Sequence, residues 1–323
     1  MYTEIAIDHI TPFKIGHAQN AEAATGCTVI LSEKGAVTGV DVRGGSPGTR
    51  ETDLLKSENL VDQVHATFLS GGSAYGLDVG TGVMNYLEEH NIGFDVQVAR
   101  VPIVPGAILF DLAIGDPSIR PNARMGYQAC LNTTNAVKQQ GNIGAGYGAT
   151  VGKCLGSPNS MKAGLGTYAI EIGKLQIGAI IAVNSFGDII DPTTNQVIAG
   201  VRDHEAGTFL YTEKQLLQQL DMSTNRFSGN TTIGTIITNA KATKANMNKI
   251  ASIAHDGIAR TMRPSHTLVD GDTLFAMTSN EVEVDINIVG MLAATVTEKA
   301  IINAIKHANS LFGIPSYQEL YKK

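Results

Sequence analysis

Hydrophobic and polar positions switch between two periodicities along the chain, which predicts strands interspersed with helices. Two apolar, β-branched runs at residues 27–31 and 36–42 predict strands, and residues 33–35 between them predict a turn. The clearest hairpin joins residues 167–172 to residues 175–183 through a Gly-Lys turn. Apolar residues alternate with smaller or polar ones in its first strand, so we expect one face of that strand to be buried.

Helical spacing of apolar residues predicts four helices. One begins after Thr243, a residue type that caps helix N-termini, and ends before Pro264. Another covers residues 76–89, where Gly80 and Gly82 weaken the helix but suit close packing against a neighbour. The remaining predicted segments are helices at 123–139 and 286–311, strands at 232–238 and 272–278, a bend or edge at 101–112, and a polar loop at 223–229.

This order of elements predicts a layered core of mixed helices and strands, either α/β or α+β. The length of 323 residues allows one large domain or two ordinary ones. We find no internal repeat and no low-complexity linker, so we expect a single domain over residues 1–323. A chain of this size buries about 75% of its unfolded surface and needs no disulfide for stability.

Composition narrows the function classes. Charged residues make up 17% of the chain, hydrophobic residues make up 43%, and the net charge is -6. This balance excludes a disordered chain, and mild acidity without a basic block argues against nucleic acid as a partner. Glycine is in excess, with 35 residues and no three-residue period. Excess glycine with little charge predicts that much surface is buried, in a layered core or between subunits.

The ends and the cysteines predict a cytoplasmic protein. Cys27, Cys130 and Cys154 form no CxxC pair, and we expect each to be a small buried residue in a reducing compartment. The N-terminal sequence MYTEIAIDHI has no basic region followed by an apolar run, so we expect no signal peptide. Uninterrupted apolar runs are far shorter than the roughly 18 residues of a membrane span.

Several short motifs lack their required context. Residues 144–149 match the dinucleotide-binding pattern GxGxxG/A, but polar residues precede them and glycine and proline follow. A nucleotide-binding module built on this segment remains an alternative, testable by NAD or ATP binding. The eight histidines show no zinc-binding spacing, so we expect no metal, and we expect no cofactor. Gly71–Tyr75 lacks the last glycine of a GxSxG nucleophile elbow. Asp270-Gly271-Asp272 is either a pair of acidic ligands or a tight turn.

Longer blocks of sequence are more specific than these motifs. GNTTIGTIITNA and HTLVDGDTLFAMTSNEVEVD resemble the C-terminal part of nylon-oligomer hydrolases. Those enzymes belong to the family of L-aminopeptidase/D-Ala-esterase/amidases and β-aminopeptidases. Upstream blocks, including DVRGGSPGTRETDLL, FLSGGSAYGLDVGTGVMNYLEE and GNIGAGYGATVGK, continue the resemblance in the same order from about residue 15 to 300.

The resemblance implies an α+β fold, a four-layer αββα sandwich of the N-terminal-nucleophile-hydrolase type. Members of the family cut themselves before a Ser or Thr, which then becomes the N-terminal nucleophile. Here the cut would fall between Asn230 and Thr231, giving residues 1–230 and 231–323. The resemblance also implies Lys153, Asn184, Asp270 and Asp272 as site residues, in addition to Thr231.

These residue types suit amide hydrolysis. A Thr hydroxyl needs a base, and an α-amino group with a pKa of about 7.7–8.0 on the same residue can supply one after the cut. Asp270 and Asp272 would orient the amine and Thr231, and Lys153 would disfavour the protonated amine. Asn184 would donate a hydrogen bond to the tetrahedral oxyanion.

The substrate would be a small linear amide, either a 6-aminohexanoate oligomer or a short peptide. The Asn-Thr junction and the DGDT block favour the nylon-oligomer branch, with aminopeptidase activity as the alternative. An acetyltransferase resembling the ornithine acetyltransferases is a further alternative. Tyr75 and Phe110 are candidate pocket residues, and some nylon-oligomer hydrolases carry Tyr where this chain has Phe110. The resemblance also implies a homotetramer of processed pairs.

Overall fold

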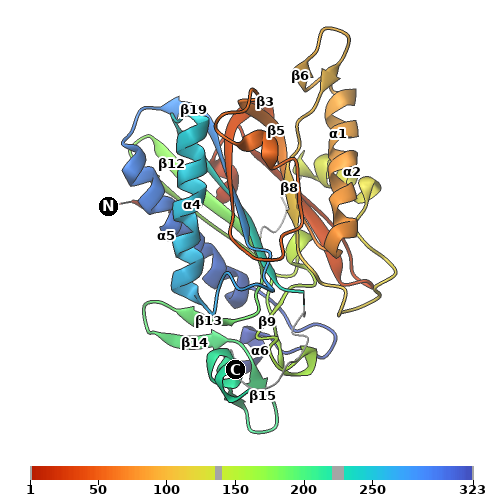
Figure 1. Ribbon diagram of the computed structural model, residues 1–323, viewed down its shortest axis with the longest axis vertical. Helices are drawn as coiled ribbons and strands as arrows, with labels where there is room; N and C mark the ends of the chain where they lie inside the picture. The colour runs from red at the N-terminus through yellow and green to blue at the C-terminus, as the bar shows by residue number, and fades with distance from the viewer. Residues whose placement is uncertain (1, 135–139, 220–228, 322–323) are drawn as a thin grey trace.

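A computed structural model describes residues 2–134, 140–219 and 229–321. Its main element is a large mixed sheet (Figure 1). The strands in spatial order are β1 (Thr3–Ile5), β11 (Leu165–Ile172), β12 (Leu175–Asn184), β17 (Thr231–Ala240), β19 (Thr273–Val282), β3 (Thr25–Val42), β5 (Gln63–Ser70), β8 (Gly106–Ile108) and β4 (Thr49–Arg50), with β2 (Lys14–Asn20) beside β3. The predicted hairpin is confirmed, since β11 and β12 pair from Ile172 opposite Leu175.

The long strand β3 belongs to both halves of this sheet. Strands β1, β11, β12, β17 and β19 form one half, and β2, β5, β8 and β4 form the other. Its first part pairs with β2 and β5, and its last part pairs with β19. The predicted turn at residues 33–35 is wrong, because β3 pairs with β5 on both sides of it, through Leu31 and Ala36. The extra residues form a bulge, with Gly35 at a φ of 83°, so the strand bends where we expected it to reverse.

Helices α4 (Lys244–Thr261) and α5 (Ile286–Lys306) cover one half of the sheet. Thr243 caps α4 as predicted, because its side chain accepts a hydrogen bond from the backbone N–H of Asn246. Helix α5 ends at Lys306, earlier than predicted, and the chain beyond it turns away to hydrogen-bond Asn309 to Asn142. By length and composition α5 could span a membrane, but 67% of its most apolar window is buried in this core.

Helices α1 (Val79–Glu89) and α2 (Ala123–Leu131) cover the other half. A Cβ at Gly82 would lie 1.7 Å from the carbonyl oxygen of Ala123, so the predicted close packing through small residues is confirmed. The first three residues of the helix expected at 76–89 belong to a 3-10 helix instead, at Ser73–Asp78, and α1 begins at Val79. Beyond α2, residues 135–139 of the predicted helix lie outside the described residues, as do residues 223–228 of the predicted loop.

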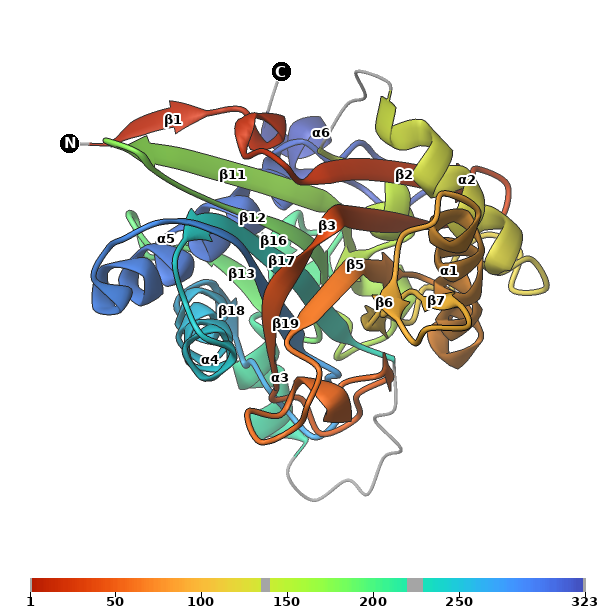
Figure 2. The same ribbon diagram turned by 90° about the horizontal axis from the view of Figure 1, so that it is seen from above.

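A third hydrophobic cluster lies between the two halves of the sheet. It joins Ile180, Ile233 and Phe275 from one half to Ile30 and Leu69 from the other. The layers therefore run helix, sheet, sheet, helix, with α4 and α5 on one side and α1 and α2 on the other (Figure 2). This order confirms the predicted α+β, four-layer αββα sandwich.

Shorter elements complete the fold, and β13, β14 and β15 lie beyond the end of the main sheet (Figure 1). The short strands and helices are β6 (Phe94–Asp95), β7 (Arg100–Val101), β9 (Thr150–Val151), β10 (Met161–Lys162), β13 (Asp188–Asp191), β14 (Gln196–Ala199), β15 (Arg202–Asp203), β16 (Thr208–Phe209), β18 (Met262–Arg263), α3 (Thr212–Gln218) and α6 (Tyr317–Tyr321). The 3-10 helices besides Ser73–Asp78 are Ile7–His9, Asp53–Leu55, Asn132–Thr134, Gly144–Gly146 and Ser157–Asn159.

Candidate active site

Thr231 is the first residue of β17, and the sheet topology brings the other candidate residues to it. Strand β12 is antiparallel to β17, so its last residue, Asn184, lies directly opposite Thr231. Strand β19 is parallel to β17, so the segment before β19 lies beside the start of β17, and Asn230 bridges to Asp270. Thr231, Asn184 and Asp270 are all buried.

Lys153 reaches this point from the segment after β9. That segment runs beside the end of β12, because the backbone N–H of Lys153 donates to the carbonyl of Phe186. The Lys153 Nζ atom donates to the carbonyl oxygen and to Oδ1 of Asn184, both at 2.9 Å, and to the carbonyl oxygen of Gly229 at 3.2 Å. Burial lowers the pKa of Lys153 to about 7, with Asp270 and Asp111 opposing that shift. The amine therefore changes charge near neutral pH.

The Asn184 side chain holds the same segment as Lys153. Its Nδ2 atom donates to the carbonyl oxygens of Phe110 at 2.8 Å and Gly229 at 3.3 Å, and its Oδ1 also accepts from the N–H of Thr150. In the continuous chain these donors therefore bind the carbonyl of residue 229 and not that of residue 230. The oxyanion role of Asn184 stays a prediction.

The carbonyl of Asn230 is bound by the segment before β19. The backbone N–H of Gly271 donates to its oxygen at 2.9 Å, and the hydroxyl of Thr231 contacts the same oxygen. A Cβ at Gly271 would lie 2.7 Å from Oγ1 of Thr231. Residue 271 must therefore lack a side chain for this segment to approach the hydroxyl this closely.

The two aspartates flank Gly271 but have different partners. Asp270 accepts hydrogen bonds from the N–H and Oγ1 of Thr267, at 3.0 and 2.5 Å, and from the N–H of Phe186 at 3.3 Å. Burial raises the pKa of Asp270 to about 6, and the charge of Asp272 adds to the shift. Asp272 binds the N–H of Thr232 through Oδ1 at 2.7 Å.

Comparison with models of protein families gives one match over nearly the whole chain. The model for peptidase family S58 matches residues 6–318. This chain belongs to peptidase family S58.

Sequence relatives of this S58 peptidase include proteins named as aminopeptidases and proteins named as 6-aminohexanoate-oligomer endohydrolases. An uncharacterized aminopeptidase of Mycobacterium leprae (strain TN) is 37% identical, with 97% of this chain and 93% of the relative covered. A 6-aminohexanoate-oligomer endohydrolase of Paenarthrobacter ureafaciens is 33% identical, with 83% and 73% covered. Both names describe hydrolases of amide bonds, and this chain is an amide hydrolase of the peptidase class.

Solved structures confirm the fold. The L-aminopeptidase D-Ala-esterase/amidase of Ochrobactrum anthropi, whose fold is described as a variant of the Ntn hydrolase fold, matches with a TM-score of 0.70. The identity is 18%, and the match covers 96% of this chain and 88% of the other. A Burkholderia sp. β-aminopeptidase matches with a TM-score of 0.69 at 18% identity, covering 100% and 94%. The S58 peptidase therefore has the predicted N-terminal-nucleophile-hydrolase fold.

The two candidate pocket residues, Phe110 and Tyr75, have different surroundings. The ring of Phe110 packs on Gly229, since a Cβ there would lie 2.1 Å from its Cγ atom. Phe110 therefore lines the segment that precedes Thr231. Tyr75 is 60% exposed, and the guanidinium of Arg120 lies 3.9 Å from the centre of its ring.

Sequence reasoning missed three parts of the site. The first is the backbone N–H of Gly271, and backbone donors have no sequence signature. The second is residues 43–46, whose backbone N–H groups bind the carbonyls of Thr267, Asp270 and Asp272 and so hold the turn in place. The third is His266, inside the recognised block HTLVDGDT, which binds Asp272. The place of His266 in that block was the sequence feature that could have indicated its role.

The other motifs do not form sites of their own kind. Residues 144–146 form a 3-10 helix followed by the short strand β9, so the nucleotide-binding pattern is not at the start of an α-helix. Within the described residues, no three His, Cys, Asp or Glu side chains are grouped so that they could hold a metal ion. The turn before β19 lies at Leu268 and Val269, and Asp270-Gly271-Asp272 leads from it into the strand, with Asp270 bridged to Asn230. The tight turn between two strands, one of the two alternatives for these three residues, is therefore wrong.

Proposed function

We propose that this S58 peptidase cuts itself between Asn230 and Thr231 and then uses Thr231 as an N-terminal nucleophile on linear amides. One observation supports the cut above all others. The carbonyl oxygen of Asn230 accepts a hydrogen bond from Gly271 and is in contact with the Thr231 hydroxyl. A donor aimed at that oxygen stabilises the negative charge that develops on it during attack.

In the first step the Oγ atom of Thr231 bonds to the carbonyl carbon of Asn230. The C–N bond between the residues breaks, and the hydroxyl proton ends on the nitrogen of Thr231. Water then hydrolyses the ester, which leaves a carboxylate on Asn230 and restores the Thr231 hydroxyl. The new α-amino group has a pKa near the working pH, so it serves as the base for later turnovers.

The cut also changes what Lys153 and Asn184 can bind. In the continuous chain both donate to the carbonyl of Gly229. Departure of residues 229 and 230 frees these donors for the acyl group of a substrate. Asn184 then stabilises the oxyanion, while Asp270 and Asp272 orient Thr231. The position of Asn184 opposite Thr231 in the sheet supports this role.

Intact-mass measurement tests the cut. Cleavage yields fragments of about 24 and 10 kDa from the chain of 34.1 kDa, in proportion to 230 and 93 residues. We expect Thr231→Ala to stay whole and inactive, and Thr231→Ser to be cut and active. Hydrolysis of amides by Thr231→Ala would refute the mechanism.

The proposed substrates are short peptides and 6-aminohexanoate oligomers, because relatives with both kinds of name cover most of this chain. Three substrates separate the possibilities: a peptide with a free N-terminus, the same peptide acetylated, and a linear 6-aminohexanoate oligomer. An aminopeptidase hydrolyses only the first peptide. An endohydrolase of the nylon-oligomer type cuts the oligomer internally, which mass spectrometry of the products detects.

The assembly and location expected from the sequence belong to the same proposal. A homotetramer has a mass four times the 34.1 kDa of one chain, before or after processing, because the fragments stay associated through the sheet. Light scattering measures that mass. Cell fractionation tests the cytoplasmic location.

A further inference from the structure

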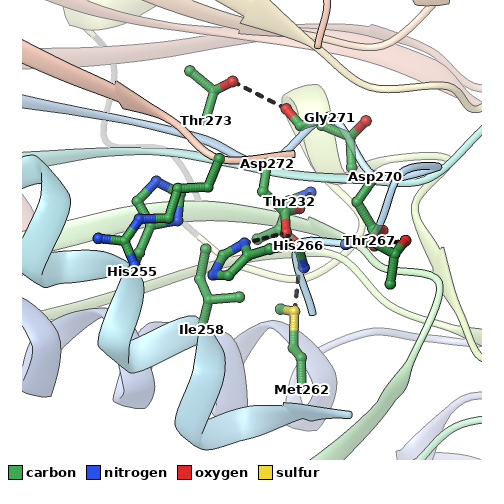
Figure 3. A network of polar contacts seen from close by, with 12 residues as sticks. Thr232, His255, Ile258, Met262, His266, Thr267, Asp270, Gly271, Asp272 and Thr273 are labelled. Atoms are coloured by element: carbon green, nitrogen blue, oxygen red, sulfur yellow. Dashed lines mark hydrogen bonds and ion pairs between the residues drawn. The ribbon is translucent and has the colours of Figure 1, made fainter. Parts of the chain in front are cut away.

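His266 lies beside Asp272, the carboxylate that also binds the strand beginning with Thr231 (Figure 3). Its Nδ1 atom is 2.8 Å from Oδ2 of Asp272, and its backbone N–H donates to the same oxygen at 3.2 Å. Within the described residues, the other ring nitrogen has no hydrogen-bond partner. Asp272 is therefore the polar anchor of this imidazole.

Asp272 connects His266 to the nucleophile. While His266 occupies Oδ2, the other oxygen accepts from the backbone N–H of Thr232 at 2.7 Å. That N–H belongs to the peptide bond that follows Thr231. With partners on both oxygens, the carboxylate has a single orientation, and the first peptide of β17 has a fixed position. Without the ring, Oδ2 keeps only the longer bond to the backbone N–H of residue 266, at 3.2 Å, and the more loosely held carboxylate would let that peptide move.

The backbone of residue 266 is adapted to this contact. His266 has a φ of 54°, in the left-handed region that residues other than glycine rarely adopt. Such a conformation persists where surrounding contacts demand it, often at functional sites. Here it lets the backbone N–H and the ring of one residue bind the same carboxylate oxygen.

His255 from α4 packs against the imidazole of His266. The two rings meet edge to face, with centroids 4.9 Å apart and planes at 68°. His255 is completely buried, and its Nε2 atom lies 3.0 Å from the carbonyl oxygen of Asp41 on β3. Burial lowers the pKa of His255 to about 4, so this neighbour is uncharged at neutral pH. It therefore packs against His266 without competing for Asp272.

We infer that His266 is a positioning residue, which fixes Asp272 and through it the first peptide of β17 so that Thr231 is held in its reactive position. This inference rests on the proposed function of Thr231. Since His266 binds Asp272 and not the substrate, its loss should lower kcat and slow self-cleavage while KM stays the same. A displacement of about 1 Å at a reacting group can cost about 100-fold in rate.

Three substitutions separate the side chain from the backbone. His266→Asn keeps a side-chain donor and tolerates positive φ, so it should retain activity within about threefold. His266→Gly accepts the positive φ but has no side-chain donor. His266→Ala has no side-chain donor and also disfavours the positive φ. For these two we expect kcat about 100-fold lower with KM within twofold. His204→Ala, on an exposed loop, is the matched control and should behave as the wild type.

Self-cleavage is followed by intact mass, and kcat is normalised to the cleaved fraction. Melting temperatures are measured for every variant. Wild-type rates in His266→Ala and His266→Gly would overturn the inference, and so would an unchanged kcat with a raised KM. The inference would also be overturned if all three variants, His266→Asn included, lost both reaction rate and melting temperature. The role of His266 would then be structural. Thr231→Ala is run in parallel: cleavage or hydrolysis by that variant refutes the proposed function itself.

Discussion

Substitution of Gly271 by alanine tests the geometry of the junction most directly. The added Cβ would lie 2.7 Å from Oγ1 of Thr231 and 2.8 Å from the carbonyl oxygen of Ser46. Gly271 is not among the residues with positive φ, so its backbone accepts alanine without strain. The N–H that binds the Asn230 carbonyl also remains in the variant. The change therefore acts by crowding the Thr231 hydroxyl on one side and the Ser46 carbonyl on the other.

The two contacts give the size of the effect. A carbon and an oxygen atom attract best at roughly 3.5 Å, so the hydroxyl or the segment around Gly271 must move by about 0.7–0.8 Å. A shift of this size at a reacting atom costs about 10- to 100-fold in rate, or about 1.4–2.7 kcal/mol in the barrier. Crowding of this buried segment also costs about 1–3 kcal/mol of folding stability.

The assay is the time course of self-cleavage after expression, read by gel and intact mass beside the melting temperature. Gly290→Ala in α5 is the control, because its Cβ would meet only the flexible end of Ile253, at 2.8 Å. We expect that control to cleave at the wild-type rate. Wild-type cleavage and melting temperature in Gly271→Ala would refute the reasoning, since they would mean that this segment does not lie against the Thr231 hydroxyl.

Three further predictions concern other buried groups. Gly82→Ala should lower the free energy of unfolding by about 2–3 kcal/mol in urea titration, because its Cβ would lie 1.7 Å from the carbonyl oxygen of Ala123. Lys153→Met should slow self-cleavage by at least about 100-fold in the intact-mass assay, because it removes the buried amine that binds the carbonyl of Gly229 just before the junction. Burial raises the pKa of Asp111 from 3.8 to about 6, so its contribution to stability is complete below pH 3.8 and is lost as pH rises through 6. Asp111→Asn should remove that decrease, about 3 kcal/mol at most, from urea unfolding curves at pH 4 and 7, measured in the uncut Thr231→Ala chain.

Elements governed by neighbouring residues could be predicted from the sequence. Thr243 caps α4 and Pro264 follows its end, as the local pattern indicated. The two-residue turn of the β11–β12 hairpin also has local causes. Residues 33–35 show where local reasoning fails. Polar residues and a glycine predict a turn, but the decisive fact is that β5 pairs with β3 on both sides of them. No local pattern contains that information.

The candidate site likewise has parts that the sequence could predict and a part that it could not. The resemblance of long sequence blocks predicted the side chains of Lys153, Asn184 and Asp270. The structure brings these side chains together around the junction between Asn230 and Thr231. The backbone N–H of Gly271 could not be found from residue types, because every residue except proline has such a group. Only its position in the folded chain distinguishes it.

The order of strands explains why spacing along the chain could not predict the site. Asn184, Thr231 and Asp270 are far apart in the sequence, so no motif of fixed length contains all three. They meet because β17 has an antiparallel neighbour on one side and a parallel neighbour on the other. The end of one strand and the starts of two others then fall at the same edge of the sheet. Reversal of either neighbour would carry its residue about nine strand positions, or roughly 30 Å, from Thr231. The chemistry of this site therefore depends on strand direction, which becomes visible only in the fold.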